Sequence, residues 1–134
     1  MQNRKARFHV TLQLPEYIYH IVREEAFTQH CKRDFYVPEG FERHGFIHCT
    51  AGEELTMQTA RRIFPGATDL LILRVRLSRL RAVVKFEPAA SASGENSVSA
   101  KPGGRFAHIY GRLNLDAVEG VTRVIDSDRF PAFP

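Results

Sequence analysis

The stretch from Gly45 to Glu53 constrains this chain most, because it predicts a short buried strand that turns directly into a helix. Phe46 favours a strand, and Thr50 followed three residues later by Glu53 is the pattern of a capping box. His48 would then lie beside the unpaired N–H groups of the helix start, where an anion such as phosphate binds favourably. The stretch leaves two interpretations open: an anion-binding corner, or a threonine cap with a histidine that only fills space.

The chain has 134 residues, which suits a single domain over residues 1–134. Its net charge of +4 and its pI of about 9.4 favour anionic partners such as nucleotides or other phosphorylated ligands. The basic residues are scattered apart from residues 4–7 and a run of arginines at positions 74, 76, 79 and 81, so no specific nucleic-acid partner is expected.

The compartment is predicted from what the sequence does not contain. No apolar run approaches the ~20 residues that a membrane helix needs, and no apolar segment follows the basic start, so neither a membrane partner nor a signal peptide is expected. Cys31 and Cys49 form no paired motif and are expected to be free thiols. These features favour a reducing, cytoplasmic location.

The hydrophobic pattern predicts an α+β fold with many strands and two clear helices. Strands are expected over residues 8–14, 17–22, 46–50, 69–77, 82–87, 106–111 and 121–125, and helices over 23–30 and 51–64. Residues 1–16 are expected to form an N-terminal extension and 32–44 mostly a loop. A mobile loop is expected over 89–104, a turn at Glu119-Gly120 and a loosely ordered tail over 126–134.

Three histidines stand in otherwise apolar strands: His20, His48 and His108. Tyr110 follows His108 by two residues, so both side chains should point to the same face of the strand. Glu87 ends another predicted strand and is the best-placed acid. We therefore expect the three histidines to line one cavity. Each histidine alone is also compatible with a hydrogen-bonded core residue, and Glu87 with a solvated strand end.

Two further kinds of site were considered. A three-histidine zinc site is not expected, because His20, His48 and His108 share no close ligand spacing. The pattern His-x-Thr occurs twice, as His9-Val10-Thr11 and as His48-Cys49-Thr50. Two such motifs on strands characterise the two-histidine phosphoesterases, in which the histidines act as acid and base on a phosphodiester. This hypothesis, with His9 and His48 as the pair, remains an alternative.

Four motifs in the chain resemble an uncharacterised bacterial and plant family, domain-of-unknown-function family 952. They are Ile18-Tyr19-His20-Ile21, Gly45-Phe46-Ile47-His48-Cys49-Thr50, Phe64-Pro65-Gly66 and Phe106-Ala107-His108-Ile109-Tyr110-Gly111. The resemblance covers roughly residues 17–125, which we take as the family core. It departs from the usual family pattern at Ala107, where proline is common.

That family is similar in fold to the ADP-ribosyltransferase superfamily. The resemblance implies a split, curved, mainly antiparallel sheet with a few short helices. It also implies a cleft for nicotinamide adenine dinucleotide (NAD) as co-substrate. In histidine-type members a Tyr-His strand opens the NAD site, so Tyr19 and His20 would bind the ribose next to the nicotinamide. The strand that carries His48 and Thr50 would form the opposite wall.

The superfamily also uses a catalytic glutamate, but no Glu-x-Glu or Gln-x-Glu motif exists here. Glu87 would substitute for it, or His108 and Tyr110 would support different chemistry. The resemblance therefore implies His48, Glu87, His108 and Tyr110 as catalytic residues, with Tyr19, His20 and Thr50 binding the ligand and no metal. The opposing hypothesis is a non-catalytic ligand-binding or regulatory module on the same fold.

Overall fold

The computed structural model describes residues 14–88 and 106–134, so the loop predicted over 89–104 and nearly all of the strand predicted over 8–14 lie outside the described residues. The helices are α2 (Glu24–His30), α3 (Phe41–His44) and α4 (Glu53–Ile63), with 3-10 turns at Leu77–Arg79 and Leu115–Ala117. The strands are β1 (Tyr17–Arg23), β2 (Phe35–Tyr36), β3 (Ile47–Thr50), β4 (Leu70–Arg76), β5 (Val83–Glu87), β6 (Phe106–Tyr110), β7 (Leu113–Asn114) and β8 (Val118–Arg123).

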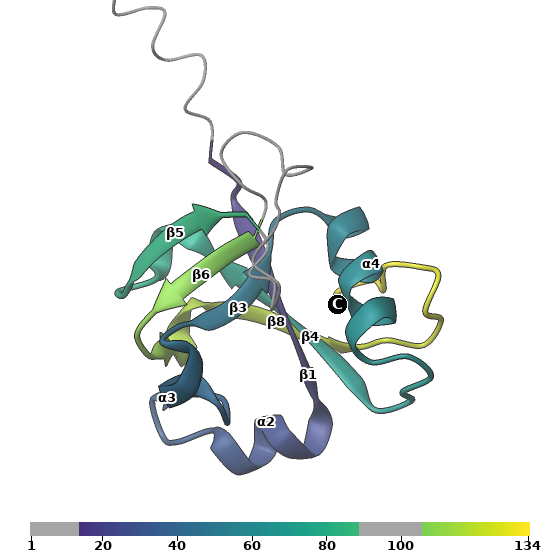
Figure 1. The fold of residues 1–134 in the computed structure, drawn as a ribbon, viewed down its shortest axis with the longest axis horizontal. Helices are drawn as coiled ribbons and strands as arrows, with labels where there is room; N and C mark the ends of the chain where they lie inside the picture. Colours follow the sequence, from purple (N-terminus) through teal and green to yellow (C-terminus); the bar gives the residue numbers. More distant parts are fainter. Residues whose placement is uncertain (1–13, 89–105) are drawn as a thin grey trace, which may run out of the picture.

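Six of these strands form one antiparallel sheet in the order β5-β6-β3-β1-β4-β8, and β2 pairs with β7 separately. Figure 1 shows that the antiparallel strands β5, β6 and β3 lie along one axis, while the antiparallel strands β1, β4 and β8 lie along another. At the junction, β1 and β3 share one register pair, Tyr19 with Thr50, whereas β1 and β4 pair along their full length. The prediction of an α+β fold with a mainly antiparallel sheet and few helices is confirmed.

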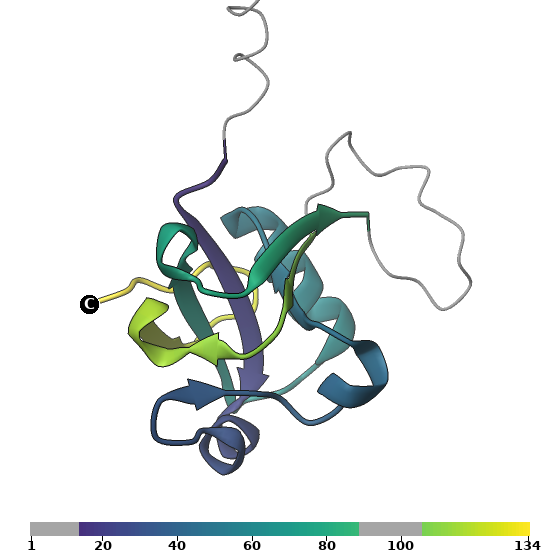
Figure 2. The ribbon, with the colours of Figure 1, turned by 90° about the vertical axis from the view of Figure 1, so that its left-hand side faces the viewer.

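The two faces of the sheet carry different cores, because alternate residues of a strand point to opposite sides. One face buries a large cluster that includes Ile18, Tyr36, Ile47, Leu73 and Ile109. The other face packs against α4 through a smaller cluster of Tyr19, Met57 and Ile72. In Figures 1 and 2, α4 lies beside the sheet, and α2 follows the end of β1. Among the described residues, no helix is long and apolar enough to cross a membrane.

The C-terminal residues pack on the sheet, so the prediction of a loosely ordered tail over 126–134 is wrong. The ring of Phe130 meets Tyr19 edge-on at a centroid distance of 5.1 Å, and Phe133 lies 4.8 Å from the Arg74 guanidinium. The turn predicted at Glu119-Gly120 is also wrong, since Gly120 lies within β8. A Cβ atom on Gly120 would come within 2.8 Å of the Phe133 ring, so this glycine allows a close approach rather than a turn.

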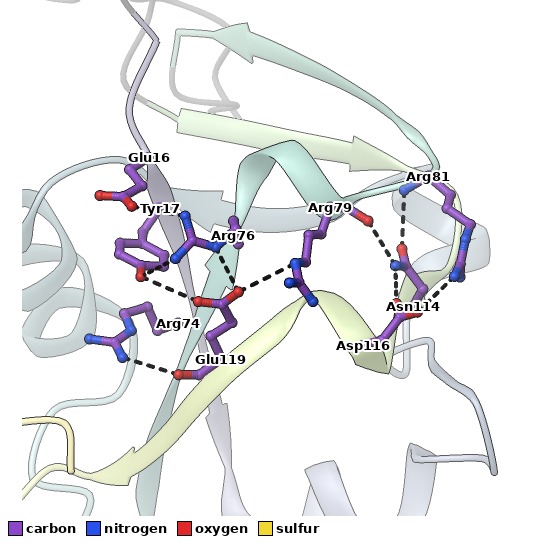
Figure 3. A network of polar contacts seen from close by, with 9 residues as sticks. All are labelled: Glu16, Tyr17, Arg74, Arg76, Arg79, Arg81, Asn114, Asp116 and Glu119. Carbon is purple, nitrogen blue, oxygen red and sulfur yellow. Dashed lines mark hydrogen bonds and ion pairs between the residues drawn. The ribbon is translucent and has the colours of Figure 1, made fainter.

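The arginine run along β4 and the turn after it is largely paired with acids, as Figure 3 shows. Arg76 Nε lies 2.6 Å from Glu119 Oε2, and Arg79 Nε lies 3.6 Å from the same oxygen. Arg81 pairs with Asp116 at 2.7 Å. Exposed ion pairs contribute little to stability singly, but a shared carboxylate joins β4, β8 and the 3-10 turn between β4 and β5. The run therefore links elements of the fold.

We predict that Phe130→Ala lowers the free energy of unfolding by about 1–2 kcal/mol, because it removes an aromatic contact with a buried ring from a half-buried position. Chemical denaturation of both proteins measures the difference. Ile125→Ala is the matched control, since that side chain is 83% exposed and should change stability by less than about 0.5 kcal/mol. Equal stability of Phe130→Ala and wild type would show that the C-terminal contact contributes nothing.

Candidate functional site

A cavity of about 510 Å³ lies where β1 and β3 part. Its walls come from β1, β3, β6, α4 and residues between Tyr36 and His44. Aromatic residues line much of it, including Phe41, Phe46 and Phe106, and Arg62 of α4 is also a lining residue. This volume is within the usual range for small-molecule sites, which combine apolar walls with a few polar groups.

His20 fills the gap between the two parting strands and is hydrogen-bonded through both ring nitrogens. Nδ1 lies 2.7 Å from the His48 carbonyl oxygen and Nε2 lies 2.9 Å from the Tyr36 hydroxyl. Because a carbonyl only accepts, Nδ1–H must donate to it, and the Tyr36 hydroxyl then donates to Nε2. Burial lowers the pKa of His20 to about 4, so the ring is neutral near pH 7. Its hydrogen bonds place it as a link between strands.

His48 and His108 form a cross-strand pair on β3 and β6, with ring centroids 5.6 Å apart. The register puts Tyr19, not His20, opposite Thr50, so the His20 side chain leaves β1 toward the other face of the sheet. All three histidines are among the residues that line the cavity, but His20 reaches it from the opposite face of the sheet, so the expectation that the three side chains share one site is wrong for His20. The part of the cavity that can do chemistry is therefore the His48–His108 side.

His108 is held by a carboxylate and covered by an aromatic ring. Its Nδ1 lies 2.6 Å from Glu87 Oε1, and the Tyr110 hydroxyl donates to the same oxygen at 2.7 Å. Phe46 stacks on the imidazole at a centroid distance of 4.0 Å. The hydrogen bond from His108, followed by that from Tyr110, lowers the pKa of Glu87, so the carboxylate is ionised. The bond to Glu87 raises the pKa of Tyr110.

This arrangement fixes the tautomer of a neutral His108. The ionised carboxylate accepts a hydrogen bond from Nδ1–H, which leaves the lone pair on Nε2. Among the residues that the structure describes, Nε2 has no hydrogen-bond partner. His108 lines the cavity, whereas Glu87 and Tyr110 lie behind it and do not. Chemically, this is an oriented base or acid at a cavity wall, with its orienting carboxylate on the far side.

His44 is a site residue that sequence reasoning missed. Its Nδ1 lies 3.2 Å from Nε2 of His48, and the two rings meet edge-on. Although His48 opens onto the cavity, the atoms packed around it, and then the charges of His44, His108 and His20, lower its pKa to about 4. The spacing of four residues between His44 and His48 was the available signal. It was overlooked because residues 32–44 were predicted to be mostly loop.

Thr50 and Tyr19 serve the packing of α4, and the capping-box prediction is wrong. Helix α4 has Gly52 as its N-cap, and no side chain caps it. Thr50 Oγ1 instead lies 2.6 Å from Thr56 Oγ1 and 3.4 Å from the Tyr19 carbonyl oxygen. The reason is that Thr50 is still part of β3, where its hydroxyl links the sheet to the helix. Tyr19 lines the cavity but is 9% exposed, and burial is the main cause of its raised pKa.

Two sequence-based hypotheses can be compared with the described residues only in part. His9 lies outside them, so the pairing of His9 with His48 stays a prediction. Within residues 14–88 and 106–134, no group of three or more His, Cys, Asp or Glu residues is placed to hold a metal ion together.

The fold and the site define a small α+β domain with a split antiparallel sheet and a histidine-lined cavity at the split. The chain belongs to the DUF952 family, described as a protein family of unknown function, whose model matches residues 21–121. No curated protein matches the chain.

Similar solved structures are those of protein CC0527 from Caulobacter crescentus. Its crystal structure has 24% sequence identity and a TM-score of 0.64, and a doubly substituted variant has 23% and 0.64; both cover 87% of this chain and 93% of CC0527. Its solution NMR structure has 23% identity and a TM-score of 0.54, covering 84% and 89%. At these identities the likeness shows the fold alone. The similarity to ADP-ribosyltransferases stays a prediction.

We predict that His20 makes the protein sensitive to acid. The folded protein holds the pKa of His20 at about 4, whereas the unfolded chain has the ordinary value of 6.5. The unfolded state therefore binds more protons as the pH falls from 6.5 to 4, which removes roughly 3 kcal/mol of stability over that window. His20→Gln has no ring to titrate, so its free energy of unfolding should fall less between pH 7 and pH 4.

Denaturation curves at several pH values check this prediction. His30→Gln is the control, because its ring lies on α2 and does not line the cavity. If His20→Gln and wild type lose the same stability in acid, then proton uptake by His20 does not couple to unfolding.

Proposed function

We propose that the protein binds a nucleotide, with NAD as the first candidate, in the cavity between β1 and β3. One observation carries this proposal: the Glu87-held imidazole of His108 faces a cavity with aromatic walls and a guanidinium. Apolar rings suit the planar base of a nucleotide, and ring nitrogens suit the hydroxyls of its ribose. The basic net charge of +4 favours an anionic ligand of this kind.

Arg62 is the residue that would hold the phosphate. It lines the cavity and has no ion pair to any described residue, whereas the cavity-lining Arg23 is already bonded to Asp69 at 2.7 Å. A guanidinium presents several N–H donors in a fixed plane and binds phosphate oxygens in pairs. The proposed orientation therefore places the phosphates near α4 and the ribose near His48 and His108.

The catalytic form of this proposal is ADP-ribosyl-transfer-like chemistry, with His108 as the residue that contacts the ribose or the acceptor and Glu87 as its orienting partner. A second candidate is a ligand-binding module without turnover. The position of Glu87 favours this second candidate, because a carboxylate that lies behind His108 does not reach a sugar in the cavity directly. Binding and turnover must therefore be measured separately.

We predict that Arg62→Gln weakens binding of NAD and of AMP at least tenfold, but leaves any binding of adenosine unchanged. The expected loss is about 1.5–3 kcal/mol, the range for a hydrogen bond to a charged group. Calorimetric titration of the folded proteins measures it. Arg61→Gln is the matched control, since Arg61 is the neighbouring residue of α4 but does not line this cavity. Equal losses in both variants would argue for general electrostatics instead of a phosphate contact.

A second prediction concerns the His108 side of the cavity. His108→Gln should weaken NAD binding at least tenfold, because it removes the ring nitrogen that faces the ligand. Release of free nicotinamide from NAD by wild type, lost in His108→Gln and in Glu87→Gln, would support the catalytic form. Binding without nicotinamide release would support the module. The absence of saturable binding of NAD, ADP-ribose and AMP to wild type would refute the proposed function.

A further inference from the structure

We infer that His44 and His48 form a binding site for a transition-metal cation of the zinc type at the mouth of the cavity. Their facing nitrogens, Nδ1 of His44 and Nε2 of His48, are 3.2 Å apart. Zinc lies 2.0–2.1 Å from histidine nitrogens, so two ligands of one tetrahedral zinc ion lie about 3.3 Å from each other. The observed separation matches that value without any movement of the backbone.

The orientation of the rings also suits two ligands of one cation. The planes cross at 89° and the centroids are 4.8 Å apart. In a straight N–H···N bond, both ring centroids would lie on the line through the two nitrogens. The distance between centroids would then be the 3.2 Å between nitrogens plus the distance from each nitrogen to its own centroid, which is more than the observed 4.8 Å. The two nitrogens are therefore not aimed directly at each other. A cation can accept a lone pair from both at once, whereas a hydrogen bond uses one donor and one acceptor.

The surroundings of the pair add one more ring. His108 of β6 lies 5.6 Å from His48 between ring centroids, and its own Nδ1 is taken by Glu87 at 2.6 Å.

The site would supply two protein ligands. Because no group of three His, Cys, Asp or Glu in the described part of the chain can hold an ion together, the other positions would be taken by water or by a molecule in the cavity. Structural zinc sites are closed by four protein ligands and catalytic ones have three, so a site with two protein ligands would leave more positions open than either kind. Two imidazoles select zinc, nickel or copper over magnesium, which prefers oxygen ligands.

The test is calorimetric titration of the untagged full chain with ZnCl₂ at pH 7.5, without any nucleotide. Wild type should bind one Zn²⁺ per chain, and both His44→Ala and His48→Gln should weaken that binding at least tenfold. His30→Ala and Cys31→Ser are matched controls, since they remove another histidine and the less buried thiol. Both should bind Zn²⁺ as wild type does, and MgCl₂ should give no binding to any of the proteins.

The outcomes separate clearly. No saturable Zn²⁺ binding by wild type, or binding by His44→Ala that equals wild type, would overturn the inference and leave the pair as a hydrogen bond. His44 is exposed, so the His44→Ala variant should fold. Its Zn²⁺ affinity therefore tests the inference even if the His48→Gln variant does not fold. Because nucleotide is absent from this titration, its result is independent of the proposed function, and either one can fail alone.

Discussion

The hydrogen bonds of His20 are the interaction on which the shape of the cavity depends. Where β1 and β3 part, the carbonyl of His48 faces a neighbouring strand that has moved out of backbone reach. An unpaired buried carbonyl would be costly, and the imidazole of His20 supplies the missing donor across a wider gap than a peptide N–H could span. Tyr36 then satisfies the second ring nitrogen. The split of the sheet is thus stabilised by one side chain, and the cavity forms at that split.

The groups that can do chemistry gather on one side of the sheet. Strand alternation puts the His48 ring on the face opposite to the His20 ring, where His108 and His44 lie. The atoms packed around His48, and then the charges of His44, His108 and His20, hold its pKa low. The single carboxylate of the group, Glu87, is tied to His108 and Tyr110. The result is a cluster of three imidazoles with one carboxylate at its back.

Much of the fold could be predicted from local patterns, since β1, α2, β4, β5 and β6 follow strong hydrophobic alternation and clear breakers. The predictions fail where contacts between residues distant in the sequence determine the local structure. Thr50 has the sequence of a helix cap, but its hydroxyl bonds to Thr56 because β3 continues through it. Gly120 suggests a turn, but it lies in a strand against Phe133. Neither contact is visible in a local window of sequence.

The candidate site shows the same limit. His48, Glu87, His108 and Tyr110 were grouped by residue type and strand position, and the structure brings them together. The face of the sheet to which His20 points could not be predicted relative to His48. Alternation shows which residues of one strand share a face, but it does not relate two strands until their register is known. His44 was missed because a four-residue helix ended by a left-handed Gly45 gives no periodic signal.

The place of Glu87 has a chemical consequence for how any reaction in the cavity can proceed. A carboxylate in direct contact with a sugar can stabilise positive charge that develops on the ring. A carboxylate behind an imidazole cannot do so at that distance, but it can stabilise an imidazolium and fix which nitrogen carries the proton. The structure has the second arrangement. Chemistry at this wall would therefore depend on proton transfer through Nε2 of His108, and the fold shared with CC0527 does not by itself determine that chemistry.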